Sequence, residues 1–212
     1  FEFWNNYMGS LPNFSKMWAN GREYTNVWLG QMPSNTTPSH AVIATGVPPS
    51  QTGIPLNRTR LANNKMDEVF RGNKPDRLIV PTVADLHDLQ TNNQAKIAGF
   101  CSQSRAVIAL VGHGKSQEGG DADFAFWLQG HRHDLETNPD YYAEIPKYLE
   151  GFSAKNYRNS FETLQFLNHR IEDDYDLFTS PHNAIMGEKL LRNLMENEGF
   201  GHDNITDLIL FN

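Results

Sequence analysis

Two adjacent threonines, Thr36 and Thr37, stand where a hydroxyl group could take part in chemistry. Pro38 follows them, and the stretch SHAVIATG over residues 39–46 predicts a helix that is closed by Gly46. At the start of a helix the backbone N–H groups are free and the helix dipole favours negative charge. A threonine there can cap the helix, or it can attack a phosphate whose charge the same field stabilises. The local pattern leaves both roles open.

Histidines offer a second kind of chemistry, metal binding. His131 and His133 stand two positions apart beside Asp134, and on a strand they would face the same side. A solvated turn explains this cluster without a metal, and it is the interpretation we prefer. We expect His113 to mark the end of a strand and His40 to have a structural role.

The elements that must position these residues alternate between strand and helix. Strands are predicted over residues 22–30, 96–101, 106–113, 121–130 and 206–211, and helices over residues 11–21, 81–94 and 182–199. The unbroken apolar runs VIALV and LILF are typical of strands buried on both faces. We therefore expect an α/β fold with a largely parallel central sheet flanked by helices, in one catalytic domain over residues 1–212. The polar, helix-rich stretch 145–175 is a possible cap or insert.

The composition excludes several classes of protein. The chain has 212 residues and a net charge of -7, which argues against a nucleic-acid-binding surface and against a polybasic membrane-surface protein. No apolar run approaches the roughly 20 residues that a membrane-spanning helix needs. A single cysteine, Cys101, excludes an internal disulfide and a metal site built from cysteines.

The segment NTTPSHAVIATGVPPSQTGI resembles the nucleophile segment of the alkaline phosphatase superfamily, in its type I phosphodiesterase/nucleotide pyrophosphatase and phosphate-monoesterase branches. In that family a Thr, three residues and a His open a helix, and a Thr-Gly, a Pro and a Gly-Ile follow. The matching positions are Thr36, His40, Thr45, Gly46, Pro49, Gly53 and Ile54, whereas Thr52 stands where the family often has His. The resemblance implies that Thr36 is the nucleophile.

The same resemblance implies roles for residues that bind the phosphoryl group. Asn57 lies just after the Gly-Ile pair, where the family's asparagine donates its amide to a phosphoryl oxygen, and Thr37 is implied to bind substrate beside it. The stretch KIAGFCSQSRAVIALVGHG resembles a segment of the monoesterase branch in which a Lys and an Arg bind phosphate. Arg105 matches that Arg, but Gln103 occupies the Lys position, which weakens a preference for monoesters. An ion pair of Arg105 with a core carboxylate is the alternative.

The resemblance also implies two divalent metal ions, probably zinc, with Thr36 as one ligand. The Asp-Gly and Asp-x-x-x-His motifs that bring the other ligands in relatives are absent from the 212 residues. We therefore expect an internal piece of a longer protein, and little activity from the piece alone. A small-molecule phosphate ester as substrate and a periplasmic or secreted location follow from the resemblance, and the oligomeric state stays open.

Three functions compete. The first is a metal-dependent phosphoester hydrolase that works through a phosphothreonine intermediate on Thr36. The second is a truncated or degenerate relative that only binds an anion or a partner. The third is an α/β-hydrolase, which the absence of a G-x-S-x-G motif disfavours.

Overall fold

The computed structural model describes residues 8–27, 34–129, 133–166 and 168–212. The chain divides into two compact units, Phe1–Gln31 and Met32–Asn212. In the first unit, the 3₁₀ turn η1 (Met8–Ser10) precedes the helix α2 (Pro12–Asn20), which ends at Gly21 as predicted. The prediction of one catalytic domain over residues 1–212 stays a prediction.

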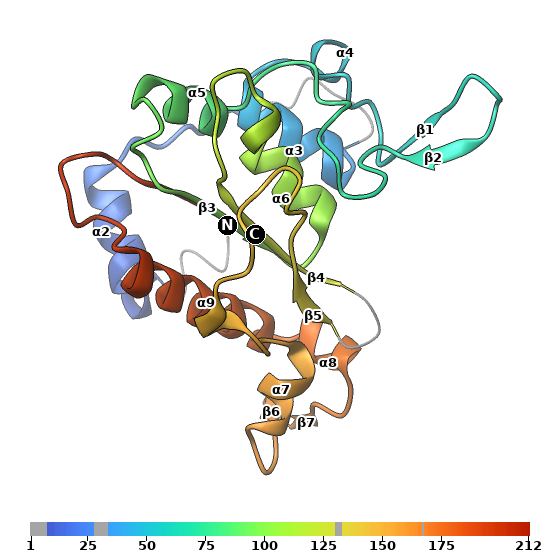
Figure 1. Ribbon diagram of the computed structural model, residues 1–212. Coiled ribbons are helices and arrows are strands. Elements are labelled where there is room, and N and C mark those ends of the chain that lie inside the picture. The colour runs from blue at the N-terminus through green and yellow to red at the C-terminus, as the bar shows by residue number, and fades with distance from the viewer. Residues whose placement is uncertain (1–7, 28–33, 130–132, 167) are drawn as a thin grey trace. The chain divides into compact units, whose positions relative to one another are not determined.

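The second unit contains the α/β fold (Figure 1). Its helices and 3₁₀ turns are α3 (Thr36–Thr45), α4 (Pro49–Thr52), α5 (Val83–Gln90), α6 (Ser104–Val111), η2 (Gly114–Ser116), η3 (Lys147–Leu149), α7 (Ala154–Asn159), α8 (Asp174–Phe178) and α9 (His182–Glu198). Its strands are β1 (Arg58–Arg60), β2 (Met66–Glu68), β3 (Ile97–Cys101), β4 (Phe124–Gln129), β5 (Asp134–Glu136), β6 (Gln165–Phe166), β7 (His169–Arg170) and β8 (Leu208–Phe211).

Four of these strands form the central sheet in the order β5-β4-β3-β8. β3 pairs in parallel with both β4 and β8, and β5 pairs antiparallel with β4 at one edge. β1 with β2 and β6 with β7 form separate antiparallel hairpins. The predicted α/β fold with a largely parallel sheet is confirmed.

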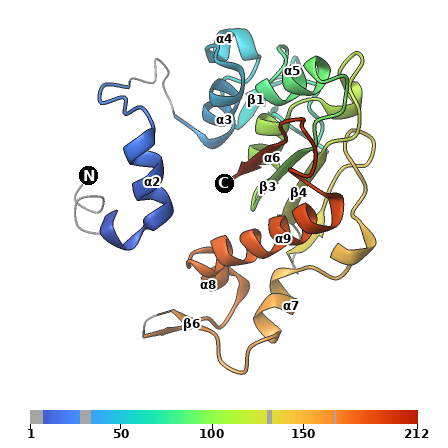
Figure 2. The same cartoon turned by 90° about the vertical axis from the view of Figure 1, so that its left-hand side faces the viewer.

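Helices cover both faces of the sheet, and the alternation of side chains along its strands explains why. Ile97 and Cys101 of β3 pack into a core with α3 and α6, whereas Ala98 and Phe100 pack into a second core with α7, α8 and α9. Figure 2 shows α3 and α6 on one side of the strands and α9 on the other. The strands are therefore buried on both faces, as their continuous apolar sequences predict.

Residues 106–113 were predicted to be a strand, and this prediction is wrong. Residues 106–111 belong to α6, every one of them is buried, and residues 112–113 follow the helix. α6 is enclosed between β3 and α3, so residues 106–111 are apolar on all sides, and an apolar run of this length is equally typical of a buried strand. Gly99 allows the close packing, because a Cβ atom at that position would overlap the side chains of Val107 and Val111.

Other predictions differ from the structure in detail. Residues 22–27 form no strand, and residues 28–30 of that predicted strand lie outside the described ranges. α5 is shorter than the predicted helix 81–94, and it buries Ala84, Asp85 and Asp88 while Leu86 is exposed. The stretch 145–175 contains the β6–β7 hairpin as well as helices. Within the described residues, no helix is long and apolar enough to cross a membrane.

Candidate functional site at the carboxyl edge of the sheet

Asn57 lies at the N-terminus of α3, although it is far from that helix in sequence. The backbone N–H of Thr37 donates a hydrogen bond to Oδ1 of Asn57 at 2.8 Å. Asn35, the residue in the N-cap position, makes no capping bond with its side chain, so Asn57 caps the helix in its place. Since Oδ1 is the acceptor, the orientation of the amide is fixed. Its Nδ2 group has no hydrogen-bond acceptor among the described residues.

The two threonines differ in exposure. Thr36 is the first residue of α3 and is partly exposed, whereas the side chain of Thr37 is fully buried. The Oγ1 atom of Thr37 has no hydrogen-bond partner, and its N–H is already taken by Asn57. Of the two hydroxyls, only that of Thr36 can meet a substrate in this conformation. The predicted contact of Thr37 with substrate stays a prediction.

The rest of α3 holds this N-terminus in place. His40 donates through Nδ1 to the carbonyl oxygen of Thr36 at 2.6 Å, which supports the structural role predicted for His40. At the other end Gly46 has a φ of 71° and its N–H bonds to the carbonyl of Val42, so the helix stops at the glycine predicted from the sequence.

α3 and α6 pack against each other, and the segments that follow them share one neighbour. The carbonyl of Thr52, in α4, accepts from the N–H of Ile79, and His113, beyond α6, bonds to the carbonyl of Leu78. Because α6 follows β3 directly, its N-terminus lies at the carboxyl edge of the sheet, where α/β proteins commonly bind ligands. That the N-terminus of α3 shares this edge is implied by the resemblance and stays a prediction.

The first turn of α6 brings the remaining predicted residues to this edge. Gln103 is the N-cap residue of α6; its exposed side chain makes no capping bond. Arg105 is partly exposed, and its Nε atom is buried without a hydrogen-bond partner. Within the described ranges Arg105 forms no ion pair, so the alternative of a core ion pair has no partner there. The edge thus combines the N-terminus of α6 with an unpaired guanidinium group, which favours an anion.

The residues described at this edge do not form a zinc site by themselves. Zinc takes about four ligands from His, Cys, Asp or Glu. Among the described residues, one group of three such side chains lies close enough together to share an ion: Asp88, Asp121 and Asp123. Asp88 is in the last turn of α5, and the other two precede β4, so this group lies at the amino edge, opposite the candidate site.

The other histidines of interest have structural surroundings. His113 bonds to Asp85 through Nδ1 at 2.9 Å and to the carbonyl of Leu78 through Nε2 at 2.8 Å. Burial lowers the pKa of His113, but these two bonds outweigh it, and the net pKa is raised. His113 follows α6, so the prediction that it ends a strand is wrong. His133 packs against Phe178, and His131 lies outside the described residues.

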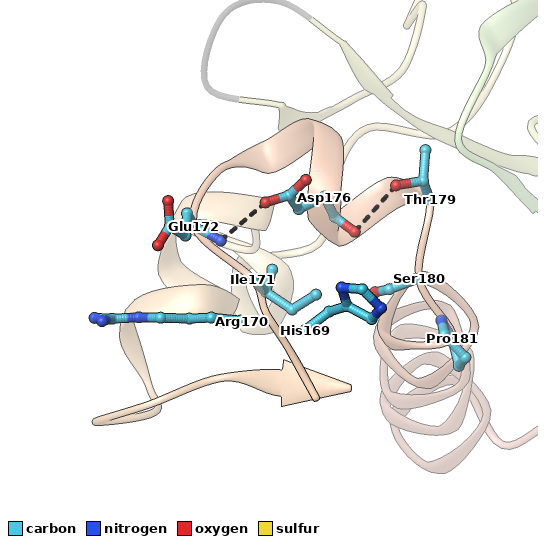
Figure 3. Close-up of a pocket in the computed structure, with 8 residues that line it drawn as sticks. All are labelled: His169, Arg170, Ile171, Glu172, Asp176, Thr179, Ser180 and Pro181. Carbon is cyan, nitrogen blue, oxygen red and sulfur yellow. Dashed lines mark hydrogen bonds between the residues drawn. The ribbon is translucent and has the colours of Figure 1, made fainter. Parts of the chain in front are cut away.

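A separate pocket lies among β7, α8 and the start of α9 (Figure 3). It is lined by His169, Arg170, Ile171, Glu172, Asp176, Thr179, Ser180 and Pro181. Figure 3 shows that Asp176 accepts a hydrogen bond from the backbone N–H of Glu172, at 3.1 Å, so this carboxylate serves the local turn. The pocket contains none of the residues predicted to do chemistry, and we do not place the function there.

Comparison with known proteins identifies the family. Residues 1–185 match the model of the type I phosphodiesterase / nucleotide pyrophosphatase family. The chain belongs to this family. Two curated relatives are a calcium-transporting ATPase of Myroides odoratus, 26% identical over 89% of this chain, and alkaline phosphatase PafA of Elizabethkingia meningoseptica, 28% identical over 77%. The chain spans only 36% and 32% of the lengths of these two proteins, about a third in each case.

Solved structures extend the family assignment to the fold. The crystal structure of wild-type PafA matches 94% of this chain with a TM-score of 0.75, at 21% identity, and the match covers 47% of the PafA chain. A PafA variant with four substitutions matches 88% of this chain with a TM-score of 0.69, at 20% identity. This phosphodiesterase-family chain therefore has the alkaline phosphatase fold over a length that corresponds to about half of PafA.

Proposed function

We propose that the protein to which this chain belongs is a phosphoester hydrolase in which Thr36 attacks phosphorus and Asn57 and Arg105 bind the phosphoryl oxygens. The observation that carries the proposal is the hydrogen bond between the N–H of Thr37 and Oδ1 of Asn57. It holds the Asn57 amide beside the residue that follows Thr36. It also leaves Nδ2 as a donor at the N-terminus of a helix, where negative charge is stabilised.

Arg105 supports the proposal through its unsatisfied buried Nε atom. A buried donor without an acceptor costs about 1–3 kcal/mol, and a phosphoryl oxygen would remove that cost. The guanidinium group can hold two phosphoryl oxygens at once, whereas the neutral amide of Gln103 adds no charge. This combination favours a substrate with less negative charge than a site with both Lys and Arg would select, which leaves both monoesters and diesters as substrates.

The spacing of the residues agrees with a solved relative. The PafA variant in the comparison replaces a threonine and an asparagine that stand 21 positions apart in its chain, and a lysine and an arginine two positions apart. Thr36 and Asn57 stand 21 positions apart here, and Gln103 and Arg105 two. The order and spacing support Thr36 as the reacting hydroxyl and Gln103 as the replacement for the lysine.

The proposed reaction has two steps. In-line attack forms a bond between Oγ1 of Thr36 and phosphorus and breaks the bond to the leaving alcohol, which takes up a proton as the hydroxyl releases one. Water then attacks the intermediate, restores the hydroxyl of Thr36, and releases phosphate from a monoester substrate or a phosphate monoester from a diester substrate. Asn57 and Arg105 orient the phosphoryl group in both steps and stabilise the charge that develops on its oxygens.

Membership of the family implies divalent metal ions. We propose two zinc ions, for which Thr36 is the one ligand that we assign within the described residues. Divalent cations at such a site lower the pKa of a hydroxyl and neutralise phosphoryl charge. By resemblance we also propose a small-molecule phosphate ester as substrate and a periplasmic or secreted location.

Turnover of two model substrates by the full-length protein tests the proposal. With zinc present, we expect the wild type to hydrolyse p-nitrophenyl phosphate, bis-p-nitrophenyl phosphate or both. Thr36→Ala should abolish this activity while the unfolding temperature stays within a few degrees of the wild type, because Thr36 is partly exposed. Thr36→Ser retains the hydroxyl and should retain measurable turnover. Thr36→Ala with wild-type rates refutes the nucleophile, and wild-type protein without zinc-dependent turnover supports a relative that only binds an anion.

A further inference from the structure

Three carboxylates converge at the amino edge of the sheet, away from the proposed active site. Asp121 and Asp123 are two positions apart in the extended segment before β4, so their side chains lie on the same side of the chain. Asp88 reaches them from the last turn of α5. One oxygen atom from each carboxylate lies within 4.8 Å of one from each of the other two.

Burial removes two of these three carboxylates, those of Asp88 and Asp123, from water. Asp88 is 2% exposed and Asp123 is 5% exposed, whereas Asp121 is exposed. The Oδ1 atom of Asp88 is buried and has no hydrogen-bond partner. In the described part of the chain, no lysine or arginine forms an ion pair with any of the three. Buried carboxylates of this kind need either a proton or a compensating positive charge.

The side-chain amide oxygen of Asn93 is also buried without a hydrogen-bond donor. Asn93, just beyond α5, has a φ of 57° and donates through Nδ2 to the carbonyl of Gly119 at 3.0 Å. That bond ties the end of α5 to the loop that leads to Asp121. It leaves Oδ1 of Asn93 buried without a donor. Two buried acceptor oxygens therefore lack a donor, Oδ1 of Asp88 and Oδ1 of Asn93, and both belong to the chain segment at the end of α5.

We propose that Asp88, Asp121 and Asp123 bind a divalent cation, with Ca²⁺ as the best fit, and that the ion fastens the end of α5 to the start of β4. Oxygen atoms within 4.8 Å of one another fall inside the reach of a single Ca²⁺ ion, and Ca²⁺ tolerates irregular oxygen geometry that Mg²⁺, with its near-ideal octahedron, does not. Every pair of the three carboxylates can therefore contact one Ca²⁺ ion. The exposed Asp121 leaves a side open for water ligands and for entry of the ion.

This site is independent of the proposed hydrolase. It lies at the opposite edge of the sheet from Arg105, and it has only oxygen ligands, which suit Ca²⁺ better than zinc. Occupancy should therefore change the stability of the fold without changing the chemistry at Thr36.

Thermal unfolding of the full-length protein with added Ca²⁺ tests the proposal, with zinc held at a fixed saturating concentration. We expect Ca²⁺ to raise the Tm by about 3 °C or more when it is about 100 times above Kd, and Mg²⁺ to raise it less. Isothermal titration with CaCl₂ should give a Kd that Asp121→Asn and Asp123→Asn each weaken by about tenfold or more.

Glu118→Gln provides the matched control, because Glu118 is an exposed carboxylate in the same loop and lies outside the cluster. This variant should retain the wild-type Kd and the wild-type rise in Tm. A wild-type protein whose Tm does not respond to Ca²⁺ overturns the proposal. Equal responses in Asp121→Asn and Glu118→Gln also overturn it. A third contrary result is a Tm that, without Ca²⁺, is higher in Asp123→Asn than in the wild type, together with a wild-type Tm that does not depend on Ca²⁺.

Discussion

Asn57 has two separable tasks, and one pair of substitutions distinguishes them. Its Oδ1 atom caps α3 through the N–H of Thr37, and we propose that its Nδ2 group donates to the phosphoryl group. Asn57→Ala removes both groups. Asn57→Asp retains an acceptor for the cap but replaces the donor with a negatively charged oxygen.

The structure sets the size of each effect. Loss of one side-chain cap costs about 1 kcal/mol, so Asn57→Ala should lower the free energy of unfolding by that amount. Asn57→Asp keeps the cap and places a negative charge at the helix N-terminus, which adds about 0.3–1 kcal/mol of stability. Loss of one preorganised donor to the transition state costs about 100-fold or more in kcat. We therefore expect Asn57→Asp to be as stable as the wild type, or more so, and about 100-fold slower.

Urea unfolding and hydrolysis of p-nitrophenyl phosphate and bis-p-nitrophenyl phosphate by the full-length zinc-loaded protein measure the two effects. Asn35→Ala is the control for stability, because the side chain of Asn35 makes no capping bond. Near-wild-type turnover by Asn57→Asp would show that Asn57 serves only the helix. That result would remove the observation on which the proposed function rests.

Two further predictions concern Arg105 and His113. Arg105→Lys retains the charge but loses the guanidinium fork, so kcat/KM for the monoester should fall about tenfold or more and fall less for the diester; equal rates in Arg105→Ala and wild type would contradict the role. The raised pKa of His113 means that its stabilising contribution is complete below about pH 6.5, the ordinary histidine pKa, and is lost as the pH rises through the folded pKa. Urea unfolding at several pH values should show this loss, and an identical loss in His113→Gln would refute it.

The sequence predicts most accurately the helices that have proline or glycine at their ends. α3 is bounded by Pro38 near its start and Gly46 at its end, and α9 ends at Gly199, so local chemistry fixes these helices. β3 and β8 are uninterrupted apolar runs, and they lie within the strands predicted over residues 96–101 and 206–211. The candidate residues Thr36, Asn57 and Arg105 come from a motif, and a motif gives order along the chain rather than distance in space.

The errors arise where tertiary packing overrides local pattern. A helix enclosed by a sheet on one face and another helix on the other is apolar on both, so the run of residues 106–111 in α6 resembles a buried strand in sequence. The buried face of α5 carries Asp85, which forms a capping box with Thr82, and Asp88, which belongs to the carboxylate cluster. The cluster of Asp88, Asp121 and Asp123 joins residues that are 33 or more positions apart, and only the pair Asp121 and Asp123 gives a local signal.

The contrast between the interior of α6 and its first residues has a consequence for how such a protein can diversify. Substitutions along α6 must satisfy the packing against β3 and α3 at once, and this packing fixes the place of Arg105 in the first turn. Gln103 stands outside that constraint, exposed at the turn between β3 and α6. If the proposed site binds phosphate, an exchange between glutamine and lysine at this position would alter the charge offered to a substrate without disturbing the core. A single substitution at position 103 would therefore change which substrates are preferred while the packing of α6 stays the same.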